Sequence, residues 1–549
     1  MLHQLSPRRL KVDLRLLGFL LFLATYLVLF LIEPRLGPID DHGFLDTIQI
    51  GKRLDFFIEP KFGRFYPLDA QEYNLIAHFL GPLPFYYYLF NACQFLLLVL
   101  VAWRVLTRVT RQRLAKIGAI CYLALVPGFA TAYFRLQVPE RGALLFFFLF
   151  LLCYLRHRER GRVQDLVGSL LFANVALYYK EPGFIMLGVF ALLHLVASWR
   201  SSPAAQKLLD GLLLLSSGIF CTLYYWLAYR HVGRHRYGET TYDQGIMLLK
   251  NLAFFMLSDP LIAVLLPTLL LYRFYRLAIA RQDRFHPLYD AMLVAALCYL
   301  LVYVALNLQT YHYLLPAYAL ALPAALHFLK ELWPAVARSR WLAVGFGALA
   351  VCLINSAVIG LNMVSVYKYV PLNYNKMLDR LAPLLDAQFQ ASGGKRTAIF
   401  LDGVNPASGN EIYASLGKFL NYSGVSSEKF DLRSELPPDN LVYYGLSPHS
   451  PYSVFNSRHT DQIQSGDLLV VSPYTSFSMA PDRLAALAQD YELLYRTASP
   501  YNIPDVNLKL FAKSLFLWGL RAGGHKEVYS PYFNYNLHRT PDFYVFKKR

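Results

Sequence analysis

The chain has 549 residues, of which 56% are hydrophobic, 15% aromatic and 16% charged. This composition excludes an ordinary soluble enzyme and is typical of a protein that crosses a membrane several times. The formal net charge of +17 does not indicate a nucleic-acid partner, because the basic residues lie in alternate loops and not in one stripe.

Eleven apolar segments are predicted to cross the membrane, because a spanning helix needs about 17–25 mostly apolar residues. Two of the segments are short and the eighth contains Ser258-Asp259-Pro260, so the count is open by one or two. The segments are Leu14–Ile32, Leu83–Trp103, Ile117–Tyr133, Gly142–Leu155, Val163–Tyr178, Gly183–Ser198, Leu208–Tyr229, Leu248–Leu271, Leu288–Leu308, Tyr311–Leu329 and Trp341–Val364.

Basic residues gather between alternate segments, for example at Arg104 to Lys116, Arg156 to Arg162 and Arg273 to Arg284. This positive-inside pattern predicts that these loops and the N-terminus face the cytoplasm. With an odd number of spans, the C-terminus then lies outside. Residues 1–32 resemble a signal sequence without a cleavage site, so we expect an uncleaved first span.

Two adjacent carboxylates follow the first span almost at once, in the segment Pro38-Ile39-Asp40-Asp41-His42. Ionisable groups at the edge of a membrane are costly to hold, so a pair there indicates a functional site. A carboxylate can accept the proton of an attacking hydroxyl group. The alternative is that the pair only caps a surface helix that begins near Gly43, because Asp is a favoured N-cap residue.

Further polar and aromatic side chains are predicted to reach the same outer face from other external loops. Fixed cations stabilise charge on a departing phosphate, which makes Lys180 and Arg135 candidates for binding a lipid phosphate. The alternative is that both only reach toward lipid headgroups. The remaining candidates are Arg64 and Tyr66 as part of a donor pocket, Glu140 and Arg141 as a pair, and Tyr311, His312 and Tyr313.

The character of the sequence changes at about Tyr367. Short strands are predicted at residues 397–401, 468–472, 491–495 and 543–546, and amphipathic helices at 376–388 and 481–491. We therefore expect a transmembrane part over residues 1–364, with a long external loop at 33–82, and a soluble α/β domain over 365–549. All six cysteines lie in apolar segments and show no metal-ligand spacing or disulfide framework.

Four motifs resemble the GT-C superfamily of polyprenyl-phosphate-dependent glycosyltransferases, which includes protein O-mannosyltransferases and lipid A aminoarabinose transferases. His312 stands where that family usually has Arg, and the resemblance covers the membrane part only. The motifs are Asp40-Asp41, Pro139-Glu140-Arg141-Gly142, Lys180-Glu181-Pro182-Gly183 and Tyr311-His312-Tyr313-Leu314-Leu315-Pro316.

The resemblance implies an inverting transferase that moves a sugar from an undecaprenyl-phosphate-type donor to a glycan, lipid glycan or protein. The transfer would take place at the outer face of a bacterial inner membrane, with the C-terminal domain in the periplasm. Asp41, or else Asp40, would be the general base. The donor phosphate would be bound by Lys180, Arg135, Arg64 and His312, and the pocket completed by Tyr66, Glu140, Arg141, Tyr311 and Tyr313.

No cofactor is indicated with certainty. A divalent metal stays open, with Asp40, Asp41, His42 and His312 as its conceivable ligands. Two other functions also remain as alternatives. One is an oligosaccharide ligase or polymerase, and the other is a transporter or flippase of lipid-linked sugars, which would show paired inverted repeats that the sequence lacks.

Overall fold

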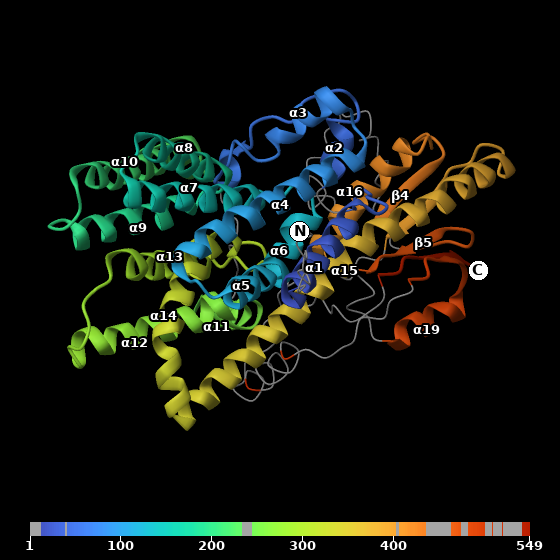
Figure 1. Cartoon of the computed structure of the whole chain (residues 1–549). Coiled ribbons are helices and arrows are strands. Elements are labelled where there is room, and N and C mark those ends of the chain that lie inside the picture. The colour runs from blue at the N-terminus through green and yellow to red at the C-terminus, as the bar shows by residue number, and fades with distance from the viewer. Residues whose placement is uncertain are drawn as a thin grey trace, which may run out of the picture.

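The computed structural model describes residues 13–38, 41–232, 244–401, 406–434, 463–473, 481–499 and 541–549, together with residues 508 and 519. Long helices form a bundle, and a small sheet lies at one end of it (Figure 1). The bundle helices are α1 (Leu14–Leu31), α4 (Pro84–Val109), α5 (Arg113–Leu125), α6 (Pro127–Phe134), α7 (Glu140–Arg160), α8 (Val163–Tyr179), α9 (Gly183–Ser198), α10 (Ala204–Leu227), α11 (Gln244–Ser258), α12 (Leu266–Phe274), α13 (Pro287–Ala305), α14 (Tyr318–Arg338) and α15 (Arg340–Ala391).

Six of the described helical segments are long and apolar enough to cross a membrane, or seven if the bent pair α5 and α6 counts as one span. These segments expose large apolar side chains, among them Leu20, Leu100 and Leu215. Such apolar surfaces are favourable in contact with the hydrocarbon of a bilayer and unfavourable in contact with water. The shorter helices α8 and α9 coincide with predicted spans, but they fall below the length of these six.

Proline explains where the observed helices depart from the predicted spans. Residues 248–271 were expected to form one span, but α11 ends at Ser258 and a second helical segment begins at Leu261, after Asp259 and Pro260. The span expected over 117–133 bends by 61° where Pro127 begins α6. Proline has no N–H group for the helical ladder and crowds the preceding turn, and both of these breaks occur at a proline, whereas Pro371 lies inside α15 without ending it.

The loop between α1 and α4 contains short elements. These are α2 (His42–Asp46), β1 (Ile58–Glu59), η1 (Pro60–Phe62), β2 (Arg64–Phe65) and α3 (Gln71–Leu80). The longest helix of this loop is α3, and residues 47–57 form turns and irregular backbone.

Helix α15 runs without interruption for 52 residues, from Arg340 through the expected boundary at Val364 to Ala391. The helix predicted at 376–388 is thus its C-terminal part. Near its middle, α15 passes the bend between α5 and α6 at Gly360, where any Cβ atom would collide with the carbonyl group of Leu125. A glycine allows this close approach of two helix backbones.

A five-stranded mixed sheet follows α15, with strand order β4-β3-β5-β7-β6. Three neighbouring strands, β4, β3 and β5, are parallel, whereas β7 pairs antiparallel with both β5 and β6. The predicted strands are present, and α16 and β4 are additional. The elements are β3 (Thr397–Leu401), α16 (Pro406–Tyr422), β4 (Phe430–Ser434), β5 (Leu468–Val471), α19 (Pro481–Asp490), β6 (Tyr491–Arg496) and β7 (Tyr544–Lys548).

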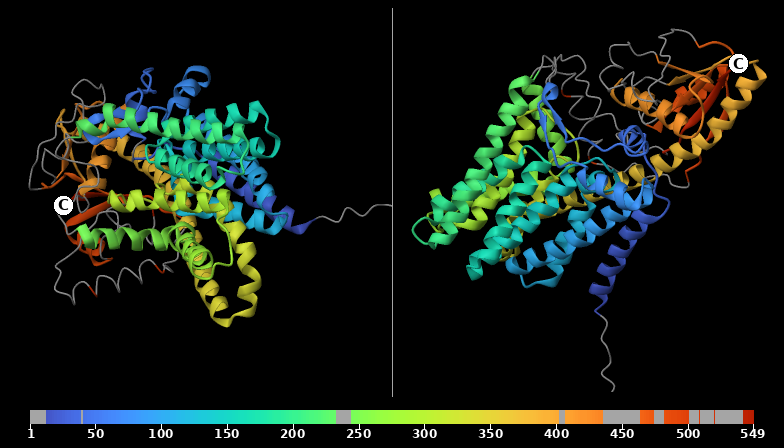
Figure 2. Two further views of the ribbon diagram at one scale, coloured as in Figure 1. Left: turned by 90° about the vertical axis from the view of Figure 1, so that its left-hand side faces the viewer. Right: turned by 90° about the horizontal axis from the view of Figure 1, so that it is seen from above.

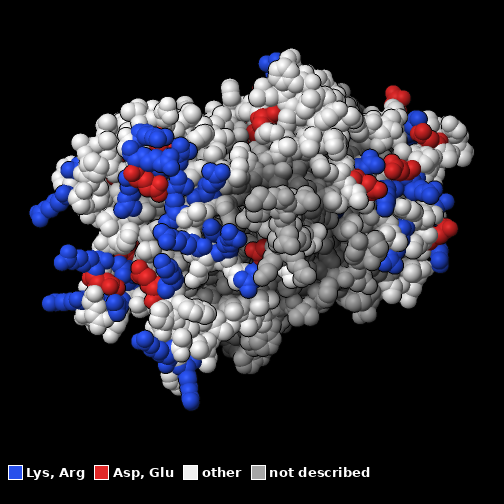
Figure 3. All heavy atoms as spheres, viewed as in Figure 1, with Lys and Arg blue, Asp and Glu red and all other residues white. Residues whose placement is uncertain are grey.

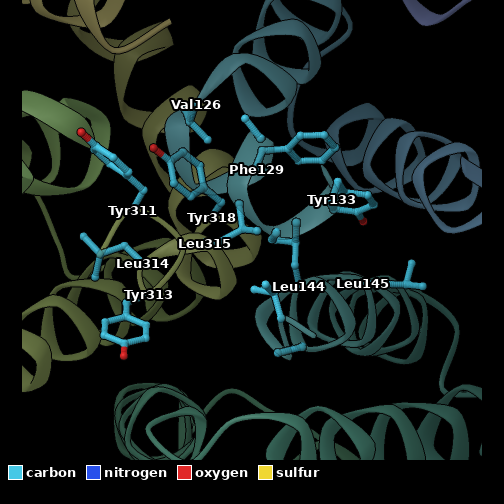
Figure 4. Packing of buried hydrophobic residues seen from close by; sticks show 14 of the residues in the cluster. Val126, Phe129, Tyr133, Leu144, Leu145, Tyr311, Tyr313, Leu314, Leu315 and Tyr318 are labelled. Carbon is cyan, nitrogen blue, oxygen red and sulfur yellow. The ribbon is translucent and has the colours of Figure 1, made fainter. Parts of the chain in front are cut away.

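One hydrophobic core runs from the bundle into the sheet, since the same cluster holds Phe30 of α1 and Val545 of β7. Figure 2 shows α15 leaving the bundle and passing alongside the sheet. Inside the bundle, side chains of α6, α7 and the segment before α14 meet around Leu315 (Figure 4). The bundle and the sheet region are therefore packed together as one unit.

The charged side chains lie mainly at the two ends of the molecule (Figure 3). Lys and Arg gather over the loops around α9, α10 and α12, at the end away from the sheet, and in this view fewer charged side chains of the described residues show between that end and the sheet end. This distribution matches a bundle whose middle lies in a bilayer, with its basic loops on one side.

Candidate functional site

The sequence-predicted residues meet at the end of the bundle opposite the basic loops. Helix α7 carries Glu140 in its first turn and Arg158 and Arg160 in its last turn. Its 21 residues place these two ends about 30 Å apart. Lys180 follows α8 directly, and residues 311–313 precede the short helix η5 (Leu315–Ala317), so three chain turns come together around Glu140.

Lys180 is the centre of this cluster. Its Nζ atom lies 2.8 Å from Oε1 of Glu140, and the two side chains are only 3% and 0% exposed. The same Nζ atom lies 5.1 Å from the ring centre of Tyr66 and 4.9 Å from that of Tyr313. A carboxylate and two aromatic faces therefore hold one buried ammonium group in a fixed place.

His312 lies on the other side of Glu140, with Nε2 3.9 Å from Oε2 of that carboxylate. Burial lowers the pKa of His312 well below its usual value, and the nearby charges of Arg135, Lys180 and Arg64 lower it further. The imidazole is therefore uncharged at neutral pH. Its Nδ1 atom is 3.2 Å from Oγ1 of Thr310.

Arg64 connects the first external loop to the turn between α8 and α9. Its Nε atom lies 3.2 Å from Oε1 of Glu181, and the same oxygen accepts the backbone N–H of Phe65 at 3.0 Å. The guanidinium also lies over Tyr66, 4.8 Å from the ring centre. Gly63, with φ of +67°, makes the turn that brings Arg64 to this place.

A pocket opens beside these cations, with about 510 Å³ of empty space when its open mouth is included. Arg64, Lys180 and Glu181 form its charged part. Apolar and aromatic side chains form the remaining wall, so the pocket has one charged end and one apolar side. The other lining residues are Phe62, Gly63, Pro182, Tyr224, Tyr229, Val232, Tyr303, Leu306, Leu308 and Tyr313.

Asp41 is buried, with 3% of its surface exposed, and its Oδ2 atom accepts the backbone N–H of Gly37 at 2.8 Å. Burial raises the pKa of Asp41 to about 7, although the backbone amides of Gly37 and Leu136 act in the opposite direction. Asp41 occupies the N-cap position of α2, but its side chain makes no capping hydrogen bond there. The helix-cap explanation is therefore wrong for Asp41, and Asp40 lies outside the described residues.

Asp41 does not line the pocket. It is linked to the cation cluster through the loop before α7, where the amide of Leu136 faces Asp41 and the charge of its neighbour Arg135 acts on His312. Arg135 itself lies over the ring of Tyr367, with Cζ 5.5 Å from the ring centre.

Two candidates have packing roles in the structure. Arg141 donates from Nη2 to Oε1 of Glu72 and to the hydroxyl of Tyr73, so the expected pair of Glu140 with Arg141 is wrong. Consecutive residues of a helix point in different directions, which explains the difference. Tyr311 packs its ring 5.2 Å from that of Phe254, away from the pocket lining.

The structure adds one carboxylate, Asp69, that was not among the candidates predicted from the sequence. Asp69 is buried beside the cluster, and burial together with the charges of Glu72 and Glu140 raises its pKa to about 8. Its position in the acidic first external loop was the only signal in the sequence.

Among the described residues, no three His, Cys, Asp or Glu side chains are grouped so that they can hold a metal ion. Of the residues named as conceivable ligands, Asp40 lies outside the described residues; burial and the charge of Lys418 lower the pKa of His42 to about 3, so its imidazole is neutral at pH 7.

Comparison with known proteins gives only distant likenesses. No model of a known protein family and no curated protein sequence matches the chain. Among solved structures, it is similar to ArnT from Cupriavidus metallidurans bound to undecaprenyl phosphate, with a TM-score of 0.47 and 15% identity over 88% of this chain and 96% of ArnT.

A second similar structure is an oligosaccharyltransferase from Archaeoglobus fulgidus tethered to an acceptor peptide, with a TM-score of 0.40 and 13% identity over 89% of this chain and 73% of that one. AglB from the same organism, in complex with an inhibitory peptide and a dolichol-phosphate, gives a TM-score of 0.38 and 12% identity. With TM-scores below 0.5, these likenesses carry no argument about function. The function of this chain is therefore argued from its own residues.

Proposed function

We propose that the protein transfers a sugar from a polyprenyl-phosphate donor to an acceptor hydroxyl or amine group at the extracytoplasmic face of a membrane. The observation that carries this proposal is the pocket in which Lys180 and Arg64 form a cationic end beside an apolar wall. A phosphate attached to a long hydrocarbon chain has the same two-sided character. The helices long enough to cross a membrane support this proposal, because such a lipid would reach the pocket from the bilayer.

The charges of the pocket suit a leaving phosphate. A lipid-linked sugar carries one negative charge on its phosphodiester, and cleavage of the sugar–oxygen bond leaves a phosphate monoester with a second charge. Lys180 and Arg64 would stabilise this additional charge more than the charge of the intact donor, which is the condition for lowering a barrier. Glu140 and Glu181 compensate both cations while the site is empty and fix their positions.

The acceptor would lose a proton as it attacks the anomeric carbon, and Asp41 is the proposed base. A carboxylate whose pKa lies near 7 can take up a proton at neutral pH and still be ionised in a large fraction of molecules. In the proposed reaction the acceptor oxygen or nitrogen bonds to the sugar, the bond to the phosphate oxygen breaks, and the proton goes to Asp41. The anomeric configuration is inverted because the attack comes from the side opposite the phosphate.

Binding of the lipid phosphate is tested with undecaprenyl phosphate, the ligand in the solved ArnT structure. Purified protein in detergent is titrated with this lipid and the complex is measured by native mass spectrometry. The variant Lys180→Met is expected to weaken binding about 10- to 100-fold, since it removes a charge-assisted contact. Lys116→Met is the matched control, because Lys116 is also buried and lies 4.5 Å from the ring centre of Trp103, on α5 outside the pocket lining.

Transfer is tested with a radiolabelled sugar on a polyprenyl-phosphate carrier and an extract of a bacterial envelope as acceptor. Asp41→Asn is expected to abolish transfer while the variant still binds the lipid phosphate. Asp165→Asn, which changes a buried carboxylate that pairs with Arg156 near the start of α8, is the control and should retain transfer. Wild-type protein that neither binds the lipid nor transfers sugar would overturn the proposal. Movement of intact lipid-linked sugar across a vesicle membrane would instead favour the transporter.

A further inference from the structure

The segment that leads to Asp41 is fastened to the C-terminal part of the chain. The side-chain amide of Asn375, in the last third of α15, donates from Nδ2 to the carbonyl oxygen of Leu36 at 3.1 Å. The same Nδ2 atom donates to the carbonyl oxygen of Pro371, one turn earlier in α15, at 2.8 Å. Both acceptors are carbonyl groups, so this amide connects α15 to the backbone just before Gly37.

Gly37 lies between Pro371 and Asp41. Its backbone N–H donates to Oδ2 of Asp41, and a Cβ atom at Gly37 would lie 3.2 Å from Cγ of Pro371 and 3.5 Å from that same Oδ2 atom. The apolar ring of Pro371 therefore packs against the backbone that holds the carboxylate. A larger residue at position 37 would push the three groups apart.

The chain beyond Asp41 is also held from the C-terminal side. Helix α2 begins directly after Asp41, and α16 packs against it (Figure 1). The hydroxyl groups of Tyr374 in α15 and Ser415 in α16 lie 3.1 Å apart, so the two helices that hold the Asp41 segment are joined to each other. Asp41 is thus enclosed by contacts on both sides in sequence.

We propose that Asn375 is a positioning residue, which fixes the carboxylate of Asp41 through the backbone of Leu36 and Gly37 and makes the C-terminal part of the chain a required framework of the active site. This inference rests on the proposed function, since it assigns the catalytic base to Asp41. Asn375 is not part of the pocket lining, and neither Leu36 nor Pro371, the acceptors of these two hydrogen bonds, lines the pocket.

Because Asn375 is hydrogen-bonded to the segment before Asp41 and does not line the Lys180 pocket, its loss is expected to change kcat and not the KM for the donor. In Asn375→Ala the carbonyl group of Leu36 loses its donor and the segment relaxes, so kcat should fall about 10- to 100-fold, as misplaced catalytic groups do. The KM for the lipid-linked donor should stay within about twofold, because the Lys180 pocket is unchanged.

The pH dependence of activity distinguishes a positioning role of Asn375 from general destabilisation, which would not shift the pH profile. The groups that face Asp41 are the amides of Gly37 and Leu136, the phenol of Tyr88 on α4 and the ring of Pro371, while Lys418 on α16 acts on the neighbouring His42. In the wild type, activity should rise with pH through about 7 as Asp41 ionises. If Asn375→Ala admits water to Asp41, its pKa falls and this rise should move to lower pH.

The experiment compares wild type, Asn375→Ala, Asn375→Gln and Asn174→Ala. Asn375→Gln keeps an amide donor and should restore part of the lost kcat. Asn174→Ala is a matched control on α8, because Asn174 also donates from Nδ2 to the carbonyl oxygen four residues earlier at 2.8 Å and to a second helix at 3.1 Å. Its kcat and pH profile should stay near those of wild type.

Hydrogen–deuterium exchange of residues 36–46 provides a measurement that needs no turnover. Exchange in this segment should become faster in Asn375→Ala and stay unchanged in Asn174→Ala. Unchanged exchange, or a kcat and pH profile equal to wild type in Asn375→Ala, would overturn the inference. Absence of transfer in the wild type would instead overturn the proposed function, and the exchange result would still decide whether Asn375 positions the segment.

Discussion

Lys180 and Glu140 form an ion pair with 2.8 Å between Nζ and Oε1, in which both side chains are almost completely removed from solvent. Their residues lie forty positions apart, at the end of α8 and the start of α7. Taking two charges out of water is costly, and only their close approach compensates the cost. The stability of the protein therefore depends on both residues of this buried pair more strongly than on the residues of an exposed pair.

Removal of one partner should accordingly destabilise the protein strongly. Glu140→Ala leaves an uncompensated buried ammonium group, and the expected loss is about 3–5 kcal/mol. Glu159→Ala, which breaks the pair of Arg108 and Glu159 with side chains 20% and 47% exposed, should cost less than about 1 kcal/mol. Thermal unfolding of both variants in detergent measures the difference, and equal shifts would contradict the role of burial.

The close approach of α15 to the bend between α5 and α6 makes a second prediction. Gly360→Ala forces a methyl group into the carbonyl of Leu125, so this variant should fail to reach the native fold. Gly345→Ala, on the same helix with no atom within 4 Å of the added Cβ, should fold as well as wild type. Size-exclusion chromatography of the two purified variants tests this, and a monodisperse Gly360→Ala protein would refute the packing argument.

His312 was expected to contribute to phosphate binding, but its depressed pKa leaves it neutral beside Glu140. His312→Gln removes no charge, so the dissociation constant for undecaprenyl phosphate should change by less than about threefold, against 10- to 100-fold for Lys180→Met. Titration by native mass spectrometry compares the two variants. A loss in His312→Gln as large as in Lys180→Met would show that the imidazole binds the phosphate directly.

The raised pKa of Asp41 predicts how stability varies with pH. The folded protein holds a proton on Asp41 up to about pH 7, whereas the unfolded chain loses it near pH 3.8, so this group contributes less stability as pH rises between those values. The full difference corresponds to roughly 4 kcal/mol. Asp41→Asn should therefore raise the thermal midpoint, and by more at pH 8 than at pH 5.5.

Asp165→Asn is the control for this measurement, because Asp165 pairs with Arg156 and its loss should not stabilise the protein at either pH. A midpoint for Asp41→Asn that is equal to or below that of wild type at pH 8 would show that the buried carboxylate is not costly. A variant that gains stability and loses transfer would be typical of a catalytic residue held under strain.

Hydrophobic segments and local residue preferences were sufficient to predict much of the architecture. The strands at residues 397–401 and 468–471 appear where β-branched and aromatic residues alternate with turn signals, and α19 appears at the amphipathic pattern that follows the second of these strands. The breaks at Pro127 and Pro260 follow from a local property of proline, although the predicted spans ran through both. The sequence did not reveal that α15 continues for 52 residues, because no local signal marks whether two helical patterns join.

The partners of the charged residues were decided by tertiary structure alone. The sequence brought Asp41, Lys180 and Glu140 to attention through their residue types and their places beside apolar segments. It paired Glu140 with its neighbour Arg141, whereas the fold pairs it with Lys180 and turns Arg141 to Glu72. Ion pairing depends on distances of a few ångströms between segments far apart in the chain, and only packing of the helices sets those distances.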